Sequence, residues 1–268
     1  MSFSLVLKHI SRTTLLVSLL GLSSLSVFAA VSNNTPVRLA LTEELSVEST
    51  HVGDVRAQYL LANKYRDGDG VLRNYHRARY WYERAALQGF APAQIDLGQL
   101  YARGQGGEVD YQKAAFWFSK AAKQSSAVAQ FNLANMYRRG LGVEQNESKA
   151  LTLYQQAAEQ GFSEAQYNLG LMYFYGRGVT KNDALALNWL QKAGEQGLAR
   201  AQHQLGKFYH DGEIVKRDLV QAALWYQRAA VSGHAEAYRA VEELKHTLNA
   251  QQLAQLEKLL LGEAVAAN

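Results

Sequence analysis

The chain has 268 residues, of which 28 are basic, 24 are acidic and none is cysteine. The absence of cysteine excludes disulfide bonds, cysteine-ligated zinc and a lipid-modified cysteine anchor. The near balance of charge, with no basic stripe carrying interleaved aromatic residues, argues against a nucleic-acid partner.

Residues 1–29 are predicted to be a secretory signal peptide. Lys8 and Arg12 form a basic segment, an apolar stretch spans 15–25, and Ala29 ends a run with small residues at positions −3 and −1. The apolar stretch is shorter than the ~18 residues that a spanning helix needs, so an uncleaved membrane anchor is the less favoured alternative. We expect cleavage after Ala29 and a periplasmic or secreted mature chain, with 26 basic and 24 acidic residues and no stable membrane anchor.

Residues 30–54 form a leader that is polar and irregular at first. Leu45 lies 36 residues before Trp81, and Gly53 lies 36 residues before Gly89. Because this interval is also that of the repeat described next, we expect a shortened N-terminal capping helix over 42–49.

A 36-residue repeat occupies residues 55–234. The dipeptide Ala-Gln marks each unit, with no insertion or deletion, at Ala57-Gln58, Ala93-Gln94, Ala129-Gln130, Ala165-Gln166 and Ala201-Gln202. Five units at constant spacing indicate one supersecondary element that is stacked repeatedly.

The first half of each unit predicts a helix, over 55–67 in the first unit. Alanine, leucine and tyrosine recur at i, i+4 and i+8, as at Leu61 and Tyr65, and form an apolar stripe. A small residue after the leucine, here Ala62, lets a second helix approach closely. A glycine such as Gly68 then suits a left-handed C-cap. An Asn or Asp in every unit suits the N-cap of a second helix, at Asn74, Asp110, Asn146, Asn182 and Asp218.

The second helix of each unit carries alanines and one large residue. All four tryptophans occupy this large-residue column, at Trp81, Trp117, Trp189 and Trp225. One interpretation is an aromatic ladder that binds a ligand. The favoured interpretation is that they fill the space between the two helices, because the repeat already accounts for their spacing.

The pattern A-Q-x-x-L-G/A-x-x-Y-x-x-G-x-G-V, followed by N/D-x-x-x-A-x-x-W-Y-x-x-A-A-x-x-G, resembles the Sel1-like repeat family, a relative of the tetratricopeptide repeats. The closest units read AQFNLANMYRRGLGV (129–143) and AQYNLGLMYFYGRGV (165–179). The resemblance implies an all-α fold, a right-handed α/α solenoid of five full helix-turn-helix repeats with a degraded C-terminal cap. It also implies a protein-binding scaffold or adaptor, with no particular partner. The lack of cysteine distinguishes the chain from disulfide-stapled secreted members.

Residues 235–268 are predicted to close the array. The segment 237–248 begins like a first helix but has Lys245 in place of the tyrosine and lacks the glycine turn, and a leucine-rich segment follows. A degraded amphipathic pair suits a cap over the last open apolar face. A docking helix that offers its leucines to a partner, among them Leu253 and Leu256, is the alternative.

No catalytic motif is present, since G-x-S-x-G, H-E-x-x-H and a P-loop lysine are all missing. We therefore expect a protein that is not an enzyme and needs no cofactor. His203 and His210 lie seven residues apart on one predicted helix, yet no further ligand stands at a convincing spacing. They are interpreted as exposed helix histidines, and no metal site is predicted.

A partner is expected to bind where the repeats differ, on the side of the first helix opposite the apolar stripe. One column there is mostly aromatic, which suits packing against a neighbouring unit equally well: Tyr59, Ile95, Phe131, Tyr167 and His203. The other columns are polar and varied, which suits a protein or peptide ligand in a groove. Because tyrosine and arginine dominate binding hot spots, the best anchors are Arg138, Arg139, Tyr175 and Arg177. Further candidates are Asn63, Gln99, Asn135, Lys207 and His210.

The leading hypothesis is an exported, non-enzymatic adaptor, taken as a monomer, that binds a partner protein or peptide through this helix face. The competing class is an envelope factor that binds peptidoglycan or polysaccharide, or an enzyme with no recognisable motif. A mainly structural component of a secretion, flagellar or polysaccharide assembly is a third option.

Overall fold

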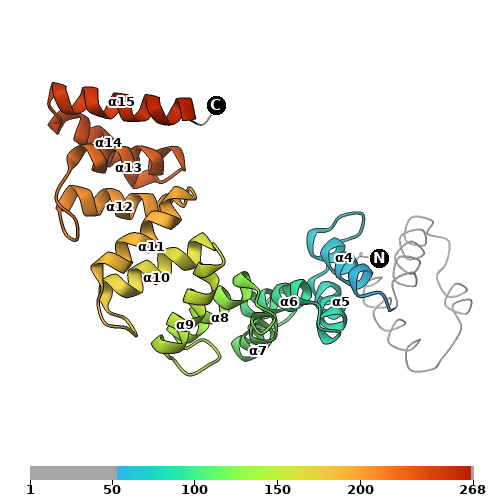
Figure 1. Ribbon diagram of the computed structural model, residues 1–268. Coiled ribbons are helices and arrows are strands. Elements are labelled where there is room, and N and C mark those ends of the chain that lie inside the picture. The colour runs from blue at the N-terminus through green and yellow to red at the C-terminus, as the bar shows by residue number, and fades with distance from the viewer. Residues whose placement is uncertain (1–52, 267–268) are drawn as a thin grey trace, which may run out of the picture. The chain divides into compact units, whose positions relative to one another are not determined.

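The computed structural model describes residues 53–266, with side chains as far as Leu261, and every helix or strand that it assigns in this range is an α-helix (Figure 1). The first helices of the repeats are α4 (Val55–Asp67), α6 (Ala91–Arg103), α8 (Ala127–Arg139), α10 (Ser163–Tyr175) and α12 (Ala199–Asp211). The second helices are α5 (Tyr75–Leu87), α7 (Tyr111–Ala122), α9 (Glu147–Glu159), α11 (Asp183–Glu195) and α13 (Leu219–Val231). Two more helices follow, α14 (Ala235–Thr247) and α15 (Ala250–Ala266). The all-α arrangement of helix pairs is confirmed, whereas the predicted signal peptide and N-terminal capping helix lie outside the described residues.

The chain divides into two compact units, 1–61 and 62–268, and the repeat packing described here belongs to the second. Within a repeat, the first helix contacts its own second helix, in the pairs α6–α7, α8–α9, α10–α11 and α12–α13. Between repeats, each second helix contacts the next first helix, in the pairs α5–α6, α7–α8, α9–α10 and α11–α12. Helices that are neighbours in the sequence therefore provide the packing, as a stack of repeats requires.

The turn inside each helix pair begins at a glycine and ends at an Asn or Asp residue, as predicted. The C-cap glycines of α6, α8, α10 and α12 all have left-handed φ angles, between 66 and 72°. The Asn or Asp side chain at the start of each second helix accepts a backbone N–H. The backbone N–H of the same residue donates to the tyrosine carbonyl of the first helix, as Asn146 does to Tyr137 at 2.9 Å. The turn is thus held at both of its ends.

The second glycine of the turn allows one repeat to approach the preceding repeat. A Cβ at Gly142 would overlap the backbone of Tyr111, the first residue of α7. Gly106 and Gly178 meet the preceding second helix at the equivalent place. Gly70, in the first repeat, has no described atom within 4 Å of such a Cβ. The Gly-x-Gly motif therefore forms a contact between repeats as well as a turn.

The small residue after the leucine faces the second helix of its own pair. A Cβ at Gly98 would lie 2.8 Å from Cε1 of Phe118, and one at Gly206 would lie 2.6 Å from the ring of Tyr226. The column that fills the space within a pair is therefore the one directly after the tryptophan: Tyr82, Phe118, Tyr154, Leu190 and Tyr226.

The tryptophans also pack, and Trp189 and Trp225 reach the preceding repeat. Trp81, Trp117 and Trp225 are buried. A Cβ at Gly194, on α11, would lie 3.1 Å from Cζ3 of Trp225, on α13. Trp189 packs in the same direction, against a cluster that includes α9 and α10. The packing interpretation is therefore right, and the ring of Trp225 fills space at the boundary between two repeats as well as within its own.

A buried glutamine in the first helix joins neighbouring repeats. Its side-chain amide donates to a carbonyl near the end of the preceding second helix, at 2.9–3.1 Å: Gln94 to Ala86, Gln166 to Ala158 and Gln202 to Gly194. Its side-chain oxygen accepts from the glutamine that follows its own second helix, at 2.7–2.9 Å: Gln124 to Gln94, Gln160 to Gln130 and Gln196 to Gln166. We call this arrangement the glutamine bridge.

The fifth repeat has an incomplete glutamine bridge. Ser232 stands where the preceding repeat has Gln196. The Oε1 atom of Gln202 is buried and has no hydrogen-bond partner among the described residues. Because an unsatisfied buried acceptor costs about 1–3 kcal/mol, this junction is weaker than those before it.

The C-terminal helices cover the fifth repeat. Leu253, Leu256 and Leu259 of α15 pack against a buried cluster of α13 and α14 that includes Tyr226 and Leu244. This packing is what the capping hypothesis requires, because these leucines are turned toward the array.

Gly142→Ala is expected to destabilise the fold more than Gly70→Ala, although the two φ angles are 68 and 70°. Both variants incur the roughly 1–2 kcal/mol cost of a Cβ in left-handed backbone. Only Gly142 has backbone against it, and this overpacking adds about 1–3 kcal/mol. Urea unfolding followed by circular dichroism measures the difference, and equal losses in the two variants would contradict a role in close approach.

Ser232→Gln is expected to raise the free energy of unfolding by about 0.5–1.5 kcal/mol, because it supplies the donor that Gln202 lacks. Ser232→Met has a side chain of similar length with no N–H group and serves as the control. Thermal unfolding compares the two, and a glutamine variant no more stable than the methionine variant would refute the explanation.

Candidate functional site

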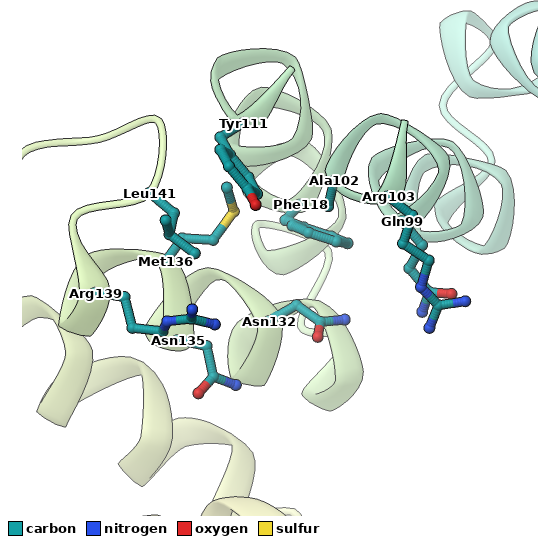
Figure 2. Close-up of a pocket in the computed structure, with 10 residues that line it drawn as sticks. All are labelled: Gln99, Ala102, Arg103, Tyr111, Phe118, Asn132, Asn135, Met136, Arg139 and Leu141. Atoms are coloured by element: carbon teal, nitrogen blue, oxygen red, sulfur yellow. The ribbon is translucent and has the colours of Figure 1, made fainter. Parts of the chain in front are cut away.

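A hollow lies between the second and third repeats, on the side of the first helices opposite their apolar stripe. We call this the outward side. This hollow, of about 440 Å³, is lined by side chains from α6, α7 and α8 and by Leu141 in the following turn. Figure 2 shows Gln99 and Arg103 on one side of it and Asn135 and Arg139 on the other. Its apolar part includes Phe118, Met136 and Leu141. The predicted candidates Gln99, Asn135 and Arg139 thus come together here, and we call the site the first hollow.

The first hollow arises from two departures from the repeat pattern. Ala102 occupies a column that contains a larger residue in every other repeat, namely Arg66, Arg138, Phe174 and His210. Phe118 stands where the first, third and fifth repeats have tyrosine, so it brings no hydroxyl group. A methyl group in place of a long side chain leaves space on the outward side, and the lining residues surround that space.

A second, smaller hollow lies between the third and fourth repeats. It has a volume of about 230 Å³ and is lined by Arg138, Asn168, Leu171, Met172 and Arg177. The guanidinium group of Arg177 lies 4.8 Å from the ring centroid of Tyr175, a side chain that is itself exposed. The structure therefore groups Arg138 with Arg177, and it places Tyr175 under Arg177 as a stacking support.

Arg138 and Arg139 belong to different hollows. The sequence suggested a single set of anchors because Arg138, Arg139, Tyr175 and Arg177 all lie near the turns of the third and fourth repeats. Adjacent residues on a helix point about 100° apart, so each arginine faces the gap on its own side of α8.

Tyr154 of α9 joins Asn135 to Arg138. Its hydroxyl group donates to Oδ1 of Asn135 at 2.7 Å and accepts from Nε of Arg138 at 3.3 Å. Burial raises the pKa of Tyr154, and the charge of Arg138 offsets part of that rise. The hydroxyl therefore stays protonated near neutral pH and can donate. This network holds both side chains at the rims of the hollows.

In the first repeat the equivalent residues are engaged with one another. Asn63 accepts from the hydroxyl of Tyr82 at 2.5 Å. Arg66 pairs with Asp67 at 2.8 Å and lies 3.5 Å from Asp96. The hydrogen bond from Arg66 lowers the pKa of Asp67. Asn63 lines neither of the two hollows.

The last two candidates, Lys207 and His210, lie on α12 and also line neither hollow. His210 pairs with Asp211 at 2.9 Å.

The interpretation of His203 as an exposed histidine was wrong, because its half-buried ring stacks on His234 with the centroids 4.2 Å apart. Phe131, at the position equivalent to His203 in the third repeat, also packs, because its ring centroid lies 5.1 Å from that of Phe162. The packing alternative for the aromatic column is therefore supported.

One contributing column escaped the sequence analysis. Asn132 lines the first hollow, Asn168 lines the second, and Asp96 at the equivalent position lies beside Arg66. The signal is a polar residue directly before the packing leucine in four successive repeats: Asp96, Asn132, Asn168 and Gln204.

In the described part of the chain, no helix combines the length and the apolar character needed to cross a membrane.

Arg138→Ala and Tyr154→Phe are expected to be coupled in stability, because one hydrogen bond joins the two side chains. Tyr154→Phe alone should cost about 0.5–1.5 kcal/mol, and the double variant should lose less than the sum of the single losses by about 0.5 kcal/mol or more. A second cycle that combines Tyr154→Phe with Arg139→Ala is the control and should be additive. Additivity in both cycles would show that the hydrogen bond does not contribute.

The Sel1 repeat family matches five consecutive segments, residues 55–90, 91–126, 127–162, 163–198 and 199–234. A Sel1 repeat protein from Oxalobacter formigenes, known as a crystal structure, is 34% identical with a TM-score of 0.67, over 70% of this chain and 75% of that one. The immunity protein Pa5087 from Pseudomonas aeruginosa is 29% identical with a TM-score of 0.47, over 68% of this chain and 67% of that one. No curated protein matches the chain. The five matched repeats establish that the chain belongs to the Sel1 repeat family.

Proposed function

We propose that this Sel1 repeat protein is an exported, non-enzymatic adaptor that binds an extended segment of a partner protein along the outward side of its first helices. The observation that carries the proposal is the first hollow, where polar and apolar side chains of two successive repeats surround one space. The sequence features of a signal peptide support export.

The lining of the first hollow suits a peptide segment with acidic residues. Arg103 and Arg139 can each donate paired hydrogen bonds to a carboxylate. The amides of Gln99, Asn132 and Asn135 can both donate to and accept from peptide groups. Phe118 and Met136 provide apolar surface for a side chain of the ligand. The second hollow adds Arg138 and Arg177 along the same side, so an extended acidic segment would meet arginine in both.

The same lining supports binding over catalysis. None of the described residues that line the first hollow is Asp, Glu, His, Lys, Ser, Thr or Cys. General bases and nucleophiles of enzymes come mostly from these types. The first hollow is thus better suited to recognise a ligand than to transform one.

Two variants are each expected to abolish capture of the partner. One replaces Arg138, Tyr175 and Arg177 simultaneously by alanine, and the other is Ala102→Phe. The triple variant removes the donors of the second hollow, and Ala102→Phe fills the first hollow with the residue type that the fourth repeat already has at Phe174. The partner is first identified by crosslinking and co-purification from the native host. Binding is then measured with the purified pair, and melting temperatures check that the variants remain folded.

The matched control for the triple variant is Tyr238→Ala with Arg239→Ala, which removes an exposed tyrosine and arginine from α14. Capture should persist in this control. Unchanged capture by both the triple variant and Ala102→Phe would refute the site. If the protein instead retains isolated peptidoglycan, and the same variants reduce that retention, the glycan-binding alternative replaces the adaptor proposal.

A further inference from the structure

Two histidines and a glutamate meet at the junction between the fifth repeat and the C-terminal helices. His203 lies on α12, His234 is the N-cap residue of α14, and Glu236 lies in the first turn of α14. The histidine rings are nearly parallel, with an interplanar angle of 12° and centroids 4.2 Å apart. The Nε2 atom of His203 lies 3.9 Å from Oε2 of Glu236. One ligand atom from each residue falls within 4.8 Å of the other two.

The surroundings of the two rings are compatible with a bound metal ion. Burial lowers the pKa of His203, and the neighbouring His234 lowers it further. The ring therefore stays neutral near pH 7, and a neutral imidazole is the form that binds metals. The Nδ1 atom of His234 is buried and has no hydrogen-bond partner among the described residues.

The spacing is close to that of a zinc site. Two ligands at 2.0–2.1 Å from a tetrahedral zinc ion lie roughly 3.3 Å apart, and the Nε2 to Oε2 distance here is 3.9 Å. The side chain of Glu236 is 71% exposed, so it can close this difference with little loss of packing. The stacked rings would need to tilt so that one nitrogen of each points at the same ion. Lys207 also lies close enough to affect His203, and its positive charge opposes a cation. The Glu236 carboxylate offsets that charge.

We propose that His203, His234 and Glu236 bind a divalent late first-row transition-metal ion such as zinc, with a fourth position left for water. Imidazole and carboxylate ligands together suit this class of ion. The site was not recognisable from the sequence, because His203 and His210 share a helix whereas His203 and His234 meet only in the fold.

A metal ion at this place would link α12 to α14. Because both elements must be in position to form the site, the ion binds the folded state and not the unfolded chain. The ion would therefore stabilise the attachment of the C-terminal pair, beside Gln202, whose side-chain oxygen has no hydrogen-bond partner among the described residues. This function is independent of partner binding at the first hollow.

The test is a titration of the purified full chain, free of a polyhistidine tag, with zinc chloride by isothermal titration calorimetry. We expect one zinc ion per chain and a rise in melting temperature that a chelator reverses. His203→Gln and His234→Gln should each weaken zinc binding by at least about tenfold, since even lost supporting contacts cost that much at metal sites. His234 makes no side-chain capping hydrogen bond, so its replacement leaves the helix cap unchanged.

Two further variants keep this test decisive. Glu236→Gln changes an exposed side chain and should weaken zinc binding while the metal-free melting temperature stays the same. His210→Gln removes a histidine from the same helix, one that also lies beside a carboxylate, and should leave zinc binding unchanged. The proposal is overturned if the unaltered chain binds no zinc, or if zinc binding is undiminished in the His203, His234 and Glu236 variants.

Discussion

A column of buried glutamines ties neighbouring repeats together. Gln166 shows the arrangement: its amide donates to the carbonyl of Ala158 in the preceding repeat, and its oxygen accepts from Gln196 in its own. A buried amide that lost such partners would cost about 1–3 kcal/mol. A shift in the spacing of the helices would break both bonds at once. This constraint explains why the Ala-Gln dipeptide keeps a 36-residue interval through all five repeats.

Because the repeated residues hold the junctions, the outward side of the first helices can vary without loss of the stack. Ala102 and Phe118 open the first hollow. Neither takes part in the glutamine bridge, but Phe118 also packs against Gly98 within its helix pair. In the third repeat the same two columns hold Arg138 and Tyr154, which bond to each other. The column of Ala102 can therefore vary without loss of the stack, whereas the column of Phe118 serves both the packing within a pair and the lining of the hollow. This agrees with the general rule that a fold does not determine a function.

At the C-terminal end of the array, two residues of the repeat pattern are replaced. Ser232 supplies no side-chain amide to Gln202, and Ile214 replaces the second glycine of the turn. The leucines of α15 cover the apolar surface that a further repeat would have covered. The stacked pair of His203 and His234 joins the fifth repeat to α14. The proposed metal site would thus add a link at the end of the array.

The sequence by itself determined the helix pairs, their number, and their ends at glycine and at Asn or Asp. These features follow from local backbone preferences and from apolar periodicity repeated at one interval. It also indicated the side of the first helix on which Gln99, Asn135 and Arg139 come together. Only the tertiary structure decided that Arg138 faces a different hollow from Arg139, that Trp225 packs toward the preceding repeat, and that His203 meets His234. Each of these depends on how one helix is placed and rotated against another, and the periodicity of a single helix carries no information about its neighbour.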